Sequence, residues 1–120
     1  MRHGTGRVKV ELALSDFELD SSRAAALGLA ANEAMTNSFK YAFEGPGEGR
    51  LRIELSSLRG RVEFAVEDDG PGFPAGFDPL KDGDIGYALM ADKARELRGR
   101  LTVGGGAGGR GARVQISFPA

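Results

Sequence analysis

Four side chains with binding or catalytic chemistry share one stripe of a predicted helix. Glu33, Asn37 and Tyr41 are four residues apart, and Lys40 follows three residues after Asn37. Asn is a poor residue for a helix interior, so propensity gives no reason for Asn37. Its amide oxygen is a good ligand for a hard cation such as Mg²⁺. Taken alone, the stripe also fits the solvated side of an amphipathic helix.

A glycine loop begins where a later predicted strand ends. Asp68-Asp69-Gly70-Pro71-Gly72 follows the strand that finishes at Val66 or Glu67. A carboxylate there, followed by Gly-x-Gly, lets backbone approach a flat ligand while the carboxylate accepts a hydrogen bond from it. The same residues have the composition of an ordinary turn, so the segment alone is weak evidence for a ligand.

A second glycine segment, residues 82–87 (DGDIGY), opens another predicted helix. A glycine-containing turn at a helix N-terminus offers free N–H groups and the positive end of the helix dipole, which suit phosphate oxygens. The alternative is that Asp84 is an N-cap between turn glycines.

The elements that position these segments follow from periodicity. Strands are predicted over residues 8–14, 51–55, 62–66, 101–103 and 113–118, and Arg59-Gly60 joins the second and third as a hairpin. Asp20-Ser21-Ser22 supplies N-cap candidates for a helix reaching about Phe43, residues 70–84 form a loop, and residues 85–97 form a second helix. This order predicts an α+β fold, a two-layer α/β sandwich with a mixed or antiparallel sheet and its helices on one face.

Composition limits the classes of function. The chain has 120 residues, 41% of them hydrophobic, a net charge of -1 and no cysteine. These values predict one globular domain and argue against nucleic-acid binding, disulfides and thiol metal sites. No apolar stretch approaches the roughly 20 residues of a membrane span. We expect a cytoplasmic domain, or the cytoplasmic portion of a membrane sensor, with residues 1–7 as a disordered start or cloning remnant and 8–120 as the folded domain.

Taken together and in this order, the segments resemble the GHKL, or Bergerat-fold, ATPases, and within them the catalytic ATP-binding domain of histidine kinases. Residues 33–41 resemble the N box, residues 68–72 match the D-x-G-x-G of the G1 box, and residues 83–89 resemble the G2 box. The likeness runs from about Val8 to Pro119. Residues 86–97 are most similar to the DesK and NarX branch, whose kinases pair with NarL-type response regulators.

The resemblance implies ATP and Mg²⁺ as ligands. Asn37 would coordinate Mg²⁺, and Glu33 would be the catalytic residue near the γ-phosphate. Asp68 would accept a hydrogen bond from the adenine amino group. The other ATP-binding residues that it implies are Lys40 at the phosphates, Tyr41 near the adenine, Gly70 and Gly72 giving clearance, and Lys81, Gly83 and Gly86 in the lid and at the helix N-terminus.

Several positions depart from the family pattern. Asp84 stands where the G2 box usually has glycine, and a carboxylate beside a triphosphate is electrostatically unfavourable. Tyr87 replaces a common leucine, and Arg98 stands where a glycine often ends the second helix. The short lid has one basic residue, Lys81. Weak nucleotide affinity, or a lid that forms only with a partner, would be consistent with these changes.

The phosphate acceptor must come from elsewhere, since the only histidine is His3. We therefore expect a monomeric domain that binds ATP without autophosphorylation, with a histidine-bearing dimerisation domain of the same kinase as its partner and a response regulator as an indirect one. Two alternatives stay open: a serine kinase of the anti-sigma-factor type, and a degenerate nucleotide-binding interaction module, which Asp84 supports. Leu101-Thr102-Val103 and the glycine-rich hairpin favour the histidine kinase.

Overall fold

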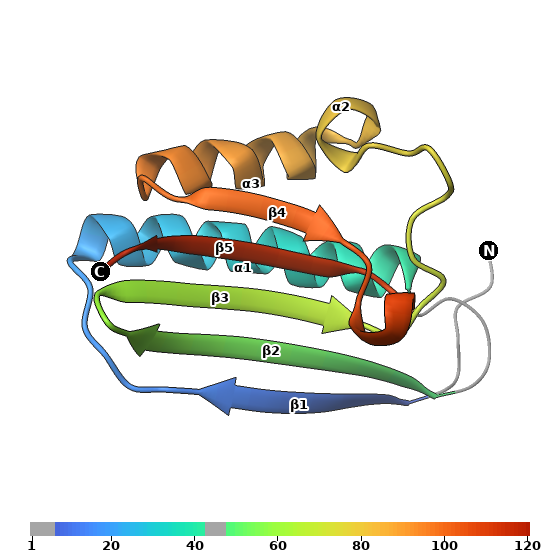
Figure 1. Ribbon diagram of the computed structural model, residues 1–120, viewed down its shortest axis with the longest axis horizontal. Helices are drawn as coiled ribbons and strands as arrows, with labels where there is room; N and C mark the ends of the chain where they lie inside the picture. The colour runs from blue at the N-terminus through green and yellow to red at the C-terminus, as the bar shows by residue number, and fades with distance from the viewer. Residues whose placement is uncertain (1–6, 43–47) are drawn as a thin grey trace.

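A five-stranded mixed sheet carries helices on one of its faces (Figure 1) in the computed structural model, which describes residues 7–42 and 48–120. The strand order is β1-β2-β3-β5-β4. The strands are β1 (Val8–Leu14), β2 (Gly49–Leu58), β3 (Arg61–Asp68), β4 (Arg100–Gly104) and β5 (Arg113–Pro119). Only the β1–β2 pair is parallel in this sheet. The predicted α+β sandwich is confirmed.

Helix α1 (Ser21–Tyr41) connects the two parallel strands, as a crossover between parallel neighbours requires. Asp20 is its N-cap and accepts a hydrogen bond from the backbone N–H of Arg23 at 3.3 Å. The guanidinium of Arg23 also binds the Asp20 carboxylate at 2.6 Å. The N-cap prediction is confirmed, and the predicted end at Phe43 lies outside the described residues.

The turn between β2 and β3 is the predicted two-residue hairpin. Arg59 and Gly60 both have positive φ, 53° and 77°, as a type I′ turn demands. Leu58 and Arg61 close the ladder on either side. This register turns Val62, Phe64 and Val66 towards the helices, and their side chains are buried.

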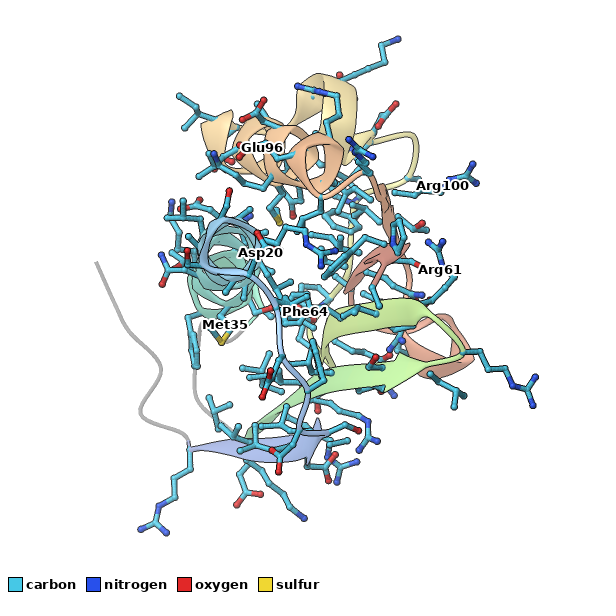
Figure 2. The ribbon with its side chains drawn as sticks, turned by 90° about the vertical axis from the view of Figure 1, so that its left-hand side faces the viewer. Asp20, Met35, Arg61, Phe64, Glu96 and Arg100 are labelled. Atoms are coloured by element: carbon cyan, nitrogen blue, oxygen red, sulfur yellow. The ribbon has the colours of Figure 1, made fainter. Side chains whose placement is uncertain are left out.

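The core lies between the sheet and the helices α1 and α3 (Ile85–Glu96). Figure 2 shows Phe64 between the layers, whereas Arg61 and Arg100 point away from the helices. Ile85 begins α3, and its apolar side chain is 86% exposed. The buried residues of α3 are Gly86, Tyr87, Met90 and Ala94.

The segment predicted as a continuous loop contains one turn of helix, α2 (Pro79–Asp82). The carboxylate of Asp82 accepts a hydrogen bond from the N–H of Asp78 at 2.9 Å, which holds this turn. A short 3₁₀ helix, η1 (Ala107–Gly109), lies between β4 and β5. These elements are too short for periodicity to reveal.

At the end of α3, Arg98 stands at the position where a glycine is expected. Arg98 takes the left-handed conformation (φ 60°) that usually favours glycine after a helix. Glycine stands one residue later, where the N–H of Gly99 donates to the carbonyl of Ala94 at 2.8 Å. A Cβ on Gly99 would overlap the carbonyl oxygen of Ser117, so this position is the one that cannot carry a side chain.

Of the predicted disordered start, residues 1–6 lie outside the described residues. The carbonyl of Arg7 accepts a hydrogen bond from Gly49 N at 2.9 Å, next to the β1–β2 ladder. None of the helices in the described parts of the chain combines the length and hydropathy that a membrane crossing requires.

Candidate functional site

Asp68 is a buried carboxylate held from three elements. It ends β3, and only 6% of its surface is exposed. One carboxylate oxygen, Oδ1, accepts hydrogen bonds from the N–H of Gly70 (3.0 Å) and of Ala112 (3.2 Å). The other, Oδ2, accepts from the hydroxyl of Ser38 on α1 at 3.1 Å. Because three donors fix it, this carboxylate is a preorganised acceptor at the end of the central strand of the sheet.

The glycines of the DDGPG segment let the chain fold tightly on itself. A Cβ on Gly70 would lie 2.6 Å from Cβ of Ala42, at the end of α1. Gly72 has a φ of 78°, and its Cβ would lie 2.7 Å from the carbonyl oxygen of Gly111. Gly111 in turn has a φ of 70° and no room for a Cβ beside the carbonyl of Asp68. The space that a side chain would occupy at Gly70 and Gly72 is therefore filled by Ala42 and Gly111, and not left open for a ligand.

A cleft of about 400 Å³ opens beside Asp68, between α1, the strand ends and the segment before α3. Ala34, Val66, Ala112 and Val114 form apolar parts of its wall. Another part is aromatic: the rings of Phe73 and Phe77 stack at 5.8 Å, and Tyr87 meets Phe73 edge-on at 6.2 Å. The remaining wall residues are Asn37, Ser38, Ala42, Asp68, Gly72, Pro74, Asp82, Gly83 and Asp84. The cleft combines flat apolar walls with a few fixed polar groups, as small-molecule sites do.

Asn37 lies on the cleft wall with an unsatisfied amide. Its side chain is 6% exposed, so the solvated-face interpretation of this residue is wrong. Its Nδ2 atom is buried and has no hydrogen-bond partner. A buried polar group without a partner is costly unless a ligand satisfies it. Rotating the amide by half a turn would present its oxygen to the same place, which fits a hard cation.

Glu33 and Gly86 lie beside this amide. A Cβ on Gly86 would be 2.7 Å from Oε1 of Glu33 and 3.6 Å from Nδ2 of Asn37. The absence of a side chain at Gly86 therefore brings the start of α3 against the polar stripe of α1. Asp84 caps α3, and its Oδ1 accepts from Gly86 N at 3.0 Å. The N-cap alternative for Asp84 is confirmed.

The structure divides the remaining predicted site residues. Gly72 and Gly83 line the cleft, whereas Gly70 packs against Ala42 and Gly86 lies beside Asn37 and Asp84 of the cleft wall. Lys40 and Lys81 are exposed and do not belong to the cleft lining, so their predicted phosphate contacts find no support in this arrangement. Tyr41 is the last residue of α1, and its side chain lies outside the described residues.

Sequence inspection missed three contributors. Ser38 lies on α1 next to Asn37, and its hydroxyl donates to the carboxylate of Asp68. Ala112 contributes through its backbone N–H, and a backbone contact cannot be predicted from the type of residue. The pair Phe73 and Phe77, four residues apart in the loop, was the one available signal for an aromatic wall.

The face of the sheet turned away from the helices has its own groove of about 470 Å³, and all of its lining residues are charged, Asp68 among them. Arg113 binds Glu67 at 2.9 Å and Glu54 at 3.2 Å, and Arg52 binds Glu54 at 2.8 Å. Hydrogen bonds from Arg113 and then Arg52 hold the pKa of Glu54 below its ordinary value of 4.5. The charges of this open face are thus largely satisfied by one another.

No group of three or more His, Cys, Asp or Glu side chains suited to a metal occurs within the described ranges. A cation in the cleft would therefore need the Asn37 amide and oxygens supplied by a ligand. Phosphate oxygens are the usual additional ligands of Mg²⁺ in nucleotide sites. The donor set fits a cation that arrives with a nucleotide.

Comparisons with known proteins agree with this geometry. The family described as "Histidine kinase-like ATPase domain" matches residues 4–114, and the chain belongs to this family. The sensor histidine kinase PdtaS of Mycobacterium tuberculosis is 33% identical over 85 residues, which are 69% of this chain and 17% of that protein. The serine-protein kinase RsbW of Listeria monocytogenes is 38% identical over 47 residues, which are 39% of this chain and 30% of RsbW.

Among solved structures, the histidine kinase domain of the Erythrobacter litoralis EL346 blue-light activated histidine kinase is similar in fold and sequence. Its TM-score is 0.84 at 28% identity, and the match covers 93% of this chain and 51% of that one. The chain thus spans less than a third of PdtaS and of RsbW, and about half of the Erythrobacter litoralis chain.

Proposed function

We propose that this domain binds Mg-ATP and serves as the catalytic domain of a sensor histidine kinase, donating the γ-phosphate to a histidine on a dimerisation domain of the same kinase. One observation carries the proposal: the fixed carboxylate of Asp68 and the unsatisfied amide of Asn37 lie on the walls of one cleft. The first suits a base with an amino group, and the second suits a cation held by phosphates.

At the base end, Asp68 accepts a hydrogen bond from the adenine amino group. Two carboxylate oxygens offer about four acceptor sites, and three donors from the chain occupy part of them. The aromatic rings of Phe73 and Phe77 and the apolar wall at Val66 and Val114 enclose the flat base. A base bound between these walls would displace water, which would strengthen its hydrogen bond to Asp68.

At the phosphate end, Asn37 holds the cation, and Glu33 orients the incoming nucleophile. When bound, Mg²⁺ neutralises charge on the triphosphate oxygens, and such neutralisation with correct positioning is most of what phosphoryl transfer needs. Glu33 is one helical turn before Asn37, so both side chains project from the same part of α1. Gly83 and the start of α3 border the same space.

The serine kinase alternative has its own support, the 38% identity to RsbW. Both kinds of kinase would use the cleft in the same way, and they differ in the acceptor. The likeness of residues 86–97 to the DesK and NarX branch, the NarL-type response regulator and the cytoplasmic location stay predictions.

The central test is a calorimetric titration with a non-hydrolysable ATP analogue in Mg²⁺. We expect wild-type binding, with Asn37→Ala weakened by about 10–100-fold, the cost typical of losing a group that supports a metal. Asn32→Ala makes the same change at an exposed position of α1 and is expected to bind as wild type does. Absence of wild-type binding at millimolar nucleotide contradicts the proposal.

The acceptor is identified by the chemistry of the bond formed. The domain is mixed with labelled ATP and either a histidine-bearing dimerisation domain or an anti-sigma-factor antagonist protein. Label that acid removes indicates phosphohistidine, as proposed, and label that survives acid indicates phosphoserine and favours the alternative.

A further inference from the structure

Three polar side chains converge on the space beside Gly86. A Cβ there would lie 2.7 Å from Oε1 of Glu33, 3.1 Å from Oδ1 of Asp84 and 3.6 Å from Nδ2 of Asn37. Glu33 and Asn37 come from α1, and Asp84 comes from the segment before α3. Two separate elements therefore direct two carboxylates and an amide at one point.

The buried, unsatisfied amide of Asn37 is the independent sign that this point can bind a ligand. Asn37 is more than nine-tenths buried, and its Nδ2 has no partner, although two carboxylates are close by. A cluster built only to stabilise the fold would satisfy a buried amide. Nδ2 itself cannot ligate a cation, but rotating the amide by half a turn directs its oxygen at the same point. An amide oxygen with carboxylate oxygens is a donor set that suits a hard divalent cation.

Charge makes the case for Asp84 in particular. A triphosphate at the start of α3 would meet the carboxylates of Glu33 and Asp84, and like charges at such short distances repel one another. A divalent cation between them turns that repulsion into attraction. A carboxylate can accept from Gly86 N and bind a cation together, because it has about four acceptor sites.

We propose that Asp84 is a second protein ligand, beside Asn37, of the divalent cation that accompanies the nucleotide, and that it prevents binding of cation-free nucleotide. The inference rests on the proposed function. It gives the residue that departs from the family's glycine a positive role: selection of the metal complex over the free triphosphate.

Asp84→Asn tests this directly, because Asn caps a helix as well as Asp does and only the charge is lost. The analogue is titrated calorimetrically into each variant with Mg²⁺ and again with EDTA. We expect Asp84→Asn to weaken binding of the Mg complex by about 10-fold or more. In EDTA it should bind the analogue more tightly than wild type. Asp84→Ser, another good N-cap, should behave in the same way.

Asp92→Asn is the matched control, a carboxylate-to-amide change on the same helix at a half-exposed position. It should leave both affinities unchanged. If Asp84→Asn binds the Mg complex as well as wild type, or weakens binding equally in Mg²⁺ and EDTA, Asp84 is only a cap and the inference is overturned. If wild type binds the analogue in neither condition, the proposed function fails as well, so the two failures are distinguishable.

Discussion

On the open face of the sheet, charged side chains from neighbouring strands bind one another, whereas the cleft on the helix side keeps polar groups for something else. Arg113 bridges Glu67 and Glu54 across the open face. In the cleft, Nδ2 of Asn37 is buried without a partner. Both grooves have similar volumes, about 470 and 400 Å³, so size does not separate them. The two grooves differ in whether their polar groups have partners. A buried polar group without a partner, such as Nδ2 of Asn37, is costly unless a ligand satisfies it.

Two adjacent carboxylates show the same contrast. Both carboxylates border the open-face groove, but of the two only Asp68 also lines the cleft, where it gathers three donors. Asp69 accepts instead from the backbone N–H of Arg50 at 2.8 Å. Substituting each in turn therefore separates binding from structure.

The largest effect is expected for Asp68→Ala. Loss of the acceptor for the base should weaken binding of the Mg-ATP analogue by about 10–100-fold, since leaving the amino group of the base without its partner costs about 1–3 kcal/mol. The free energy of unfolding should also fall, because Ser38 Oγ and two backbone N–H groups lose their acceptor. Titration calorimetry and urea unfolding measure both.

Asp69→Ala is the companion variant, and its nucleotide affinity should stay within about twofold of wild type, as for surface substitutions generally. Equal losses for the two variants would show that the whole loop, rather than the cleft carboxylate, determines binding.

A smaller effect is expected for Gly111→Ala, which tests how the cleft floor is built. A Cβ there would overlap the Asp68 carbonyl in a left-handed backbone, so we expect a loss of stability of about 3 kcal/mol or more. Gly108→Ala carries nearly the same φ, 69°, in open space, and should cost only the conformational strain of about 1–2 kcal/mol. Urea unfolding compares them, and equal losses would contradict the close approach.

The smallest effect is expected on the open face, for Glu54→Gln. The side chain of Glu54 is 34% exposed, so its ion pairs should contribute no more than about 1 kcal/mol at neutral pH. Its folded pKa is lowered, so this stability is present above 4.5 and is lost as pH falls through the folded pKa. Unfolding of wild type and variant, followed by pH, should therefore converge in acid.

Nucleotide affinity should not change in Glu54→Gln. Glu18→Gln, an exposed glutamate, provides the baseline for removing one charge. A gap between Glu54→Gln and wild type that widens in acid would mean that the ion pairs of the open face are not its cause.

Much of the fold was readable because its signals are local. Alternation gave every strand, and the Arg59-Gly60 turn gave the hairpin. Two residues that line the cleft were predicted as ligand-binding for a similar reason: Asn37 is out of place by helix propensity, and Asp68 ends a strand before glycine.

The rest depends on packing between distant segments. Asp68 meets Ser38 across 30 residues and Ala112 across 44, and no spacing rule reports such register. Lys40 shares a stripe with Asn37 in sequence, yet Asn37 is buried and Lys40 is exposed. The direction of α1 relative to the sheet determines which of the two side chains is buried. A helical stripe is wide enough for one of its edges to face the core and the other to face solvent.

The long separations around Asp68 also set when in folding the cleft can form. The β2–β3 hairpin needs only a two-residue turn, whereas the β3–β5 pairing that brings Ala112 to Asp68 closes a loop through α2, α3 and β4. Such non-local contacts are slow to form. A partly folded chain therefore has no complete pocket, and a nucleotide that binds only the finished one stabilises it by mass action. In a cell, bound nucleotide would therefore favour the chain in which the cleft is complete over partly folded forms.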